Sequence, residues 1–154
     1  MDSKFPHYWK TYIAQSSYAA LSVFFITLIL SENPVVIASI GATAFIVFAL
    51  PNNIASDPKR IIGCHFLGFF IGSCFAVFPF MGIVFFKAIW FALAIVITIL
   101  FMVVLDFEHP PAAGTALGMT LVGYSVSAAA AITISILLLT LIAYLTKPYL
   151  KDLV

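Results

Sequence analysis

Residues 88–117 read AIWFALAIVITILFMVVLDFEHPPAAGTAL, and this stretch decides the fold class. Residues 88–105 contain no charged side chain, and at 1.5 Å per residue a helix of this length crosses a hydrocarbon core of roughly 30 Å. An acidic turn, two prolines and a run of small residues follow. The stretch therefore predicts a membrane-spanning helix, a turn at the membrane surface and the start of a second helix.

The composition of the whole chain agrees with this interpretation. Hydrophobic residues make up 64% of the 154 residues and charged residues only 8%, with a formal net charge of +1. A soluble domain of this length could not bury so much apolar surface. The composition predicts an all-α, polytopic membrane helix bundle whose partner is the lipid bilayer, and it indicates no nucleic-acid partner.

The uncharged runs divide the chain into six segments. Residues 12–30 and 61–78 are each long enough to cross the bilayer, as are residues 88–105. Residues 34–50 are short for a crossing, whereas residues 110–146 are too long for one. A glycine and small polar residues at 123–125 suit a turn. This turn leaves residues 110–122 and 126–146, so the second and fifth segments are the short ones.

Three dipeptides predict where helices begin. Asn33-Pro34, Asp57-Pro58 and His109-Pro110 each place a potential capping residue before a proline. Proline is favoured in the first turn of a helix because its missing N–H would have no partner there. The dipeptides therefore support helix starts for the second, third and fifth segments.

The basic residues predict the orientation of the chain. If all six segments cross, one side carries all of them except Lys87, an excess that is typical of the cytoplasmic side. If the two short segments re-enter instead, the division is five against two. Six crossings with both termini in the cytoplasm, in a bacterial plasma membrane, are therefore preferred. The six residues on the shared side are Lys4, Lys10, Lys59, Arg60, Lys147 and Lys151.

The two halves of the chain share a pattern. Glu32-Asn33-Pro34 leads to the small residues of 39–44, and Glu108-His109-Pro110 leads to those of 113–116. With three crossings each, residues 12–80 and 83–146 would form two repeats of opposite direction, an arrangement that is typical of transporters. Small residues also let helices pack closely in any membrane bundle, so both interpretations stay open.

Three runs of sequence carry a resemblance to a known family. HPPAAGTAL at residues 109–117 resembles the His-Pro-Pro hallmark of the HPP family of integral membrane proteins. SIGATAFIVFALP at residues 39–51 and ASDPKRIIGCH at residues 55–65 are similar to the other pattern of that family. Cys64 stands where a second glycine is expected, and Asp57 where glutamine is more common.

The resemblance implies a function. Family members in chloroplasts and cyanobacteria are associated with nitrite transport, so it implies a transporter or channel for a small inorganic anion, with nitrite as the first expectation. The chain would be one transmembrane domain, residues 1–154, with no soluble domain. A non-transporting membrane subunit and an intramembrane enzyme are the alternatives.

A pathway for an anion is expected between the two short segments. No Lys or Arg lies inside a predicted span, so the attraction would come from unsatisfied N–H groups at the helix N-termini and from hydroxyl groups. We expect Gly41 and Gly114 to mark close backbone approach there. The candidate pathway residues are Ser39, Gly41, Thr43, His109, Pro110, Pro111, Gly114 and Thr115.

Four titratable residues are candidates for gating or proton coupling, namely Glu32, His65, Glu108 and His109. His109 either takes part through its proton, so that transport rises as the pH falls from about 8 to about 6, or acts only as a helix cap. His65 either reaches a polar cavity or extends to the membrane surface.

Other kinds of site receive little support. No pair of histidines has a catalytic spacing such as His-x-x-x-His, and Cys64 and Cys74 have no ligand spacing with histidine. We therefore expect no enzyme activity, catalytic residue, metal or cofactor. Gly68 and Gly72 place small residues on one face of the third segment, which predicts tight helix contacts within the bundle or in a homo-oligomer, a dimer or trimer.

Overall fold

The computed structural model describes residues 5–30, 34–78 and 83–153, and within these ranges helices joined by short connections account for the whole fold. No strand occurs in these ranges. The helices are α1 (Phe5–Leu30), α2 (Pro34–Ala49), η1 (Ile54–Ser56), α3 (Pro58–Val77), α4 (Val84–Val104), α5 (Pro111–Val122), α6 (Val126–Thr146) and η2 (Lys147–Tyr149), where η denotes a short 3₁₀ helix.

The predicted division into long and short segments is confirmed. Four of the described helices, α1, α3, α4 and α6, are long and apolar enough to cross a membrane, and α2 and α5 are shorter. Helix α6 has the predicted bounds. Helix α5 begins one residue later than predicted because Pro110 takes its N-cap position. Helix α1 begins at Phe5, well before the predicted Tyr12, and has a kink at Tyr8.

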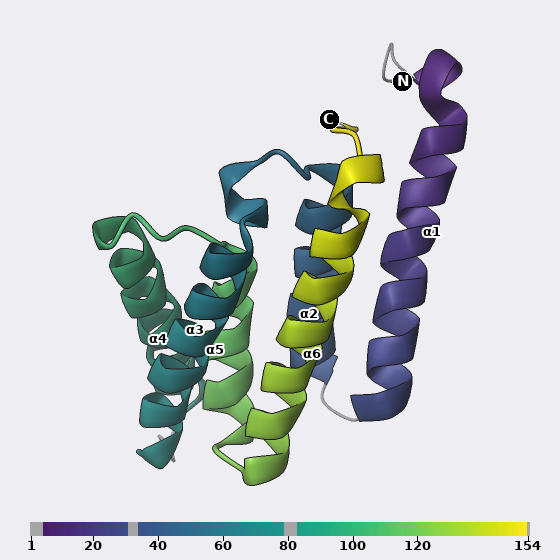
Figure 1. The fold of residues 1–154 in the computed structure, drawn as a ribbon. Coiled ribbons are helices and arrows are strands. Elements are labelled where there is room, and N and C mark those ends of the chain that lie inside the picture. Colours follow the sequence, from purple (N-terminus) through teal and green to yellow (C-terminus); the bar gives the residue numbers. More distant parts are fainter. Residues whose placement is uncertain (1–4, 31–33, 79–82, 154) are drawn as a thin grey trace.

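The helices alternate in direction along the bundle (Figure 1). The start of α1 and the C-terminal segment lie at one end, together with the connections from α2 to α3 and from α4 to α5, and the connection from α5 to α6 lies at the opposite end. Lys59 and Lys147 therefore share the end of the termini, and Lys87 lies at the other end. Each short helix runs opposite to the helix before it, and six crossings of a membrane require this alternation.

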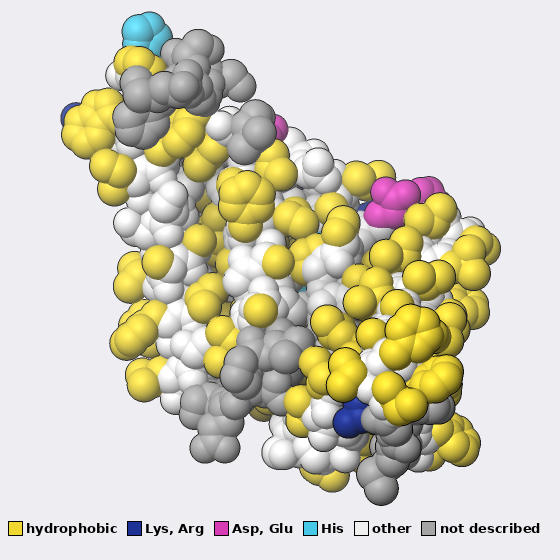
Figure 2. Space-filling view, turned by 180° about the vertical axis from the view of Figure 1, so that it is seen from behind, with side chains coloured by type: hydrophobic (Ala, Val, Ile, Leu, Met, Phe, Trp, Pro, Cys, Tyr) yellow, Lys and Arg dark blue, Asp and Glu magenta, His cyan; other side chains and the backbone are white. Residues whose placement is uncertain are grey.

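The outside of the bundle is apolar along its length. Figure 2 shows hydrophobic side chains over the middle of one face, with charged side chains only towards the ends. On α1, Leu21 and Phe24 are more than half exposed, as are Val96 and Leu100 on α4. Such a surface is stable in lipid and unstable in water. The chain is therefore an integral membrane protein.

Helix α5 lies against α2, α3 and α4. A Cβ atom at Gly68 would overlap the carbonyl oxygen of Ala112, and one at Gly72 would overlap that of Ala116. The absence of a side chain thus lets the backbones of α3 and α5 approach each other directly. The tight contact predicted for Gly68 and Gly72 is confirmed, and it lies within the bundle.

The C-terminal segment, residues 150–153, forms hydrogen bonds with both α1 and the end of α2. The Gln15 side chain, 1% exposed on α1, donates from Nε2 to the carbonyl oxygens of Phe48 and Lys151, and its Oε1 accepts from the Lys151 N–H. The Leu153 N–H donates to the carbonyl oxygen of Ala49 at 2.9 Å. These bonds give partners to carbonyl groups at the C-terminus of α2, which the helix itself leaves unpaired.

Candidate functional site

The N-terminal halves of the two short helices lie side by side. The Ser39 hydroxyl on α2 donates to the carbonyl oxygen of Pro111, the first residue of α5, at 2.7 Å. It also lies 2.9 Å from the Thr115 hydroxyl oxygen, one turn further along α5. The two helices run in opposite directions (Figure 1), and the contacts of Ser39 with Pro111 and Thr115 show that they overlap through their first halves.

Two histidines join this contact from outside the short helices. His65, on α3, lies with Nδ1 2.8 Å from the Thr115 hydroxyl oxygen and with Nε2 2.9 Å from that of Thr43. His109, in the connection between α4 and α5, lies with Nε2 3.1 Å from the same Thr43 oxygen. Its Nδ1 donates to the carbonyl oxygen of Ala55 at 2.7 Å. Thr43 therefore lies between the two imidazole rings.

These five side chains form what we call the buried polar network. Each is almost completely enclosed, with exposed fractions of 3% for Ser39, 1% for Thr43, 1% for His65, 0% for His109 and 2% for Thr115. Polar groups buried in a membrane protein are costly unless they are paired, and they are commonly functional. The network brings together four of the predicted pathway residues and two of the predicted gating residues, His65 and His109, of which His109 was predicted for both roles.

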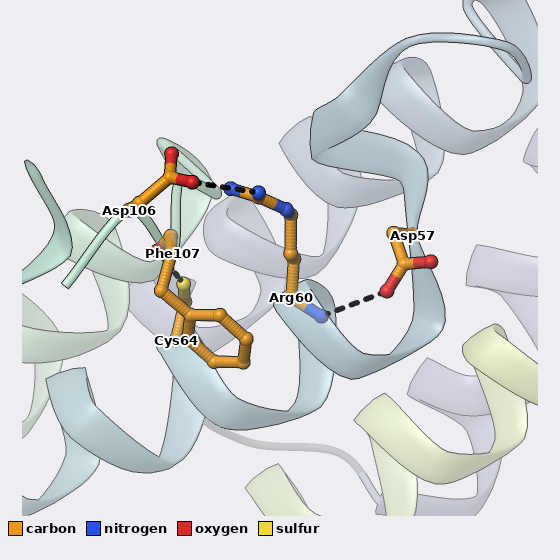
Figure 3. Close-up of polar contacts among 5 residues, drawn as sticks. All are labelled: Asp57, Arg60, Cys64, Asp106 and Phe107. Carbon is orange, nitrogen blue, oxygen red and sulfur yellow. Dashed lines mark hydrogen bonds and ion pairs between the residues drawn. The ribbon is translucent and has the colours of Figure 1, made fainter.

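The position of His109 depends on how its connection docks onto α3 (Figure 3). The Arg60 side chain lies 3.7 Å from the Asp106 carboxylate, and the Cys64 thiol donates to the carbonyl oxygen of Phe107. The Phe107 ring covers Gly63, where a Cβ atom would overlap it. Asp106 has a φ of +49°, a left-handed conformation that aspartate tolerates better than most residues. These contacts turn the chain so that His109 points into the bundle.

Asp57 fixes the start of α3, as predicted. Its carboxylate accepts from the backbone N–H of Lys59 at 2.9 Å and from that of Arg60 at 3.4 Å (Figure 3). An aspartate at this position also interacts favourably with the positive end of the helix dipole. The cap sets where the helix begins and thereby the direction in which His65, two turns later, points.

The capping role considered for His109 is not what the structure shows. No side chain caps α5, and the His109 ring points towards Ala55 and Thr43 instead. Burial lowers the pKa of His109 to about 4, although the Ala55 carbonyl opposes this shift. The ring is therefore neutral near pH 7 when no anion is close by. A rise in transport at low pH stays a prediction, and it depends on an anion beside the ring.

His65 does not extend to the membrane surface. Its ring is enclosed, and the centres of the two imidazole rings are 5.0 Å apart. Within the described ranges, no three His, Cys, Asp or Glu side chains gather closely enough to hold a metal ion. Both rings make hydrogen bonds of the network through both of their nitrogen atoms.

The close backbone approach expected at Gly41 and Gly114 is absent. A Cβ atom at Gly41 would meet nothing within 4 Å, and one at Gly114 would make ordinary contacts at 3.5–3.9 Å with Ser39. The expectation was wrong because it paired the two short helices through glycine, whereas they meet through hydroxyl groups. The glycines that need the space are Gly68 and Gly72 on α3.

The N-terminus of α5 offers fewer free N–H groups than expected. The N–H of Ala112 donates to the carbonyl oxygen of His109 at 3.0 Å, and that of Ala113 to Pro110 at 3.1 Å. These turn-like bonds satisfy groups that a helix start often leaves open. The hydrogen-bond donors close to the network are therefore its own hydroxyl and ring N–H groups.

The remaining candidates lie apart from the network. Glu108 lines a crevice of about 340 Å³ between α4 and the start of α5, next to His109 and Pro110. Glu32 lies outside the described residues. The other residues that line the crevice are Ile99, Met102, Val103 and Ala113.

Several parts of this site could not be predicted from the sequence. The Ala55 carbonyl is a backbone group, and no side-chain pattern could reveal it. The docking of Asp106 and Phe107 onto α3 joins residues more than 40 positions apart in the sequence. The only available signal was the pair of similar motifs, which indicated that the two regions belong together but not which atoms meet.

The sequence profile of the family described as "HPP, transmembrane region" matches residues 4–152. The chain belongs to the HPP family. No curated protein and no solved structure matches it. The His-Pro-Pro triplet of this HPP protein lies at the network, because the His109 ring and the Pro111 carbonyl both make bonds within it.

Proposed function

We propose that this HPP protein carries a small inorganic anion, nitrite in the first instance, across the membrane through the buried polar network. The observation that carries the proposal is the network itself: five polar side chains enclosed and joined by hydrogen bonds inside an apolar bundle. Neutral hydroxyl and ring N–H groups can replace the water around an anion without holding it as tightly as a buried cation would. Such a site binds weakly enough to release the ion on the other side.

The location of the network supports a transport role. Ser39, Thr43 and His65 come from the first half of the chain, and His109 and Thr115 from the second. In transporters with inverted repeats, substrates bind between the repeats at short or interrupted helices, and movement of one repeat against the other opens the site to either side. Here a movement of α2 away from α5 would expose the hydroxyl groups between them.

The choice of nitrite comes from the family resemblance, and the orientation from the basic residues. Five basic residues of the described ranges, Lys10, Lys59, Arg60, Lys147 and Lys151, lie at the end that carries both termini. By the positive-inside rule this end faces the cytoplasm. With this end in the cytoplasm, we propose the plasma membrane of a bacterium as the location of the protein.

Anion flux into liposomes that contain only the purified protein tests the proposal. The wild-type protein should take up nitrite faster than empty liposomes do. Thr115→Val removes a network hydroxyl while keeping the shape of the side chain, and it should reduce flux about tenfold, the effect of losing one buried hydrogen bond. Thr120→Val is the matched control, because the Thr120 hydroxyl on the same helix bonds back to the Ala116 carbonyl at 2.8 Å.

The alternatives predict different results. A non-transporting subunit would give no flux above empty liposomes until a partner is added, and an intramembrane enzyme would consume nitrite in detergent solution without a membrane. Equal flux in Thr115→Val and Thr120→Val proteins that are both folded would exclude the network as the pathway.

A further inference from the structure

The buried polar network is one continuous chain of hydrogen bonds with a carbonyl group at each end. Both ends, the carbonyl oxygens of Ala55 and Pro111, can only accept hydrogen bonds. Between them the chain has six links, which run from the Ala55 carbonyl through His109, Thr43, His65, Thr115 and Ser39 to the Pro111 carbonyl. One branch leaves it at Thr43, whose hydroxyl can donate instead to the Ser39 carbonyl oxygen of its own helix at 3.0 Å, and a hydrogen used there is lost to the six links.

The chain has one hydrogen fewer than it has links when both rings are neutral. Each neutral imidazole carries one N–H and each hydroxyl one O–H, so two rings and three hydroxyls supply five hydrogens for six links. One link must therefore lack a hydrogen. His109 donates to Ala55 through Nδ1. If the four other donors all point along the chain towards Pro111, the link without a hydrogen is the longest one, 3.1 Å between His109 Nε2 and the Thr43 oxygen.

One added proton completes the chain. With a proton on Nε2, His109 donates to Ala55 through Nδ1 and to Thr43 through Nε2. Thr43 then donates to His65, which in turn donates to Thr115. The step forms one N–H bond on His109 and breaks one O–H bond of a hydronium ion, and no covalent bond within the protein breaks. All six links then hold a hydrogen when the Thr43 hydroxyl points to His65 and not to the Ser39 carbonyl.

We propose that the network is a binding site for one proton, which it takes up together with the anion, so that the protein is an electroneutral proton–anion symporter. This inference rests on the proposed transport function. The positive charge explains the coupling, because an imidazolium that is fully enclosed needs a counter-charge, and the anion supplies it. Each of the two ligands therefore strengthens binding of the other.

The charged and titratable groups around His109 leave the role of counter-charge for its imidazolium to the anion. On its own connection, the Asp106 side chain is 88% exposed and lies 3.7 Å from that of Arg60, whose Nη1 is buried without a hydrogen-bond partner among the described residues. Glu108 lines the crevice beside His109. From α3 the Cys64 thiol bonds to Phe107, and His65 belongs to the chain. Helices α2, η1 and α5 carry no titratable side chain, and α4 carries only Lys87 at its far end.

Two driving forces applied separately to liposomes test the coupling. Nitrate, the anion of a strong acid, serves beside nitrite to exclude passage of the free acid through lipid. A difference of about one pH unit, acidic outside, should concentrate either anion about tenfold inside, because one proton accompanies each anion. A membrane potential without a pH difference should concentrate neither. Anion accumulation that follows the potential and ignores the pH difference would overturn the symport and leave anion transport intact.

A second measurement does not depend on flux. Adding nitrate to the purified protein in weakly buffered detergent should take up about one proton per protein, as reported by a pH-sensitive dye. Thr43→Val breaks the chain and should abolish the uptake, whereas Thr43→Ser restores the hydroxyl and should recover it. Thr98→Val is the control, because the buried Thr98 hydroxyl bonds only to the Ala94 carbonyl of its own helix. Proton uptake without flux would keep the proton site and contradict the transport function, and no uptake would contradict the proton site.

Discussion

Helix α5 meets its two neighbours, α3 and α2, in different ways. Against α3, Gly68 and Gly72 bring backbone onto backbone, where even a methyl group does not fit. Against α2, the contact runs through the hydroxyl groups of Ser39 and Thr115. Backbone packing has one arrangement, whereas hydroxyl groups can exchange partners with an ion or with water. The comparison indicates that α3 and α5 move as one unit and that the α2 side rearranges.

The contact between α3 and α5 can also be compared with its counterpart in the other repeat. If α6 corresponds to α3 and α2 to α5, the counterpart of the α3–α5 contact is the contact between α6 and α2. That contact is made by large side chains, and Ile136 and Leu139 of α6 share one hydrophobic cluster with Val47 and Phe48 of α2. Similar sequence motifs thus give one contact of backbone on backbone and one of side chain on side chain.

The largest expected effect concerns topology, because the comparison of repeats requires all six segments to cross. A cysteine introduced near Lys59 should react with an impermeant reagent from the same side of the membrane as one near Lys147, and one at Lys87 only from the opposite side. Labelling of the Lys59 and Lys147 positions from different sides would mean that the short helices re-enter and would break the comparison. The labels should be introduced after Cys64 and Cys74 are replaced.

The next largest effect compares a substitution in the contact between α3 and α5 with one at a position on α2 that has open space beside it. Gly72→Ala places a methyl group against the Ala116 carbonyl and 2.7 Å from the Met119 Cβ, so it should lower the free energy of unfolding by about 3 kcal/mol. Gly41→Ala meets open space on α2 and should raise it by about 0.5–1 kcal/mol. Thermal unfolding of both variants in detergent checks the pair. Equal stability of the two variants would contradict the close packing of α3 on α5.

The smallest expected effect concerns the pH dependence of stability, which depends on the polar network between α2 and α5. Burial lowers the pKa of His109 from 6.5 to about 4, so between these values the unfolded chain binds more protons than the folded one. The contribution of neutral His109 to stability is therefore fully present above pH 6.5. The free energy of unfolding should fall by about 2 kcal/mol between pH 7 and pH 5 in the absence of anion. His109→Gln should show a smaller fall, and nitrate should reduce the fall in the wild type. An identical pH profile for wild type and His109→Gln would remove His109 as the cause.

The sequence predicted the elements better than it predicted their contacts. Uncharged runs, prolines and the Gly123 turn follow from local chemistry, because lipid demands apolar side chains and satisfied backbone groups at every position. The Asp57 cap and the bounds of α6 were predicted for the same reason. The expectation for Gly41 and Gly114 was wrong, because a glycine in the sequence does not show which backbone lies opposite.

By itself, then, the sequence determined the membrane class, the six segments and a short set of polar residues that lipid would not tolerate without partners. Only the tertiary structure decided how those residues are joined. His65 and His109 are 44 positions apart, yet both reach Thr43, because the Phe107 connection docks onto α3 and turns His109 inwards. Hydrogen bonds depend on distances of a fraction of an ångström between groups on different helices, and such distances are set by packing and not by any local pattern.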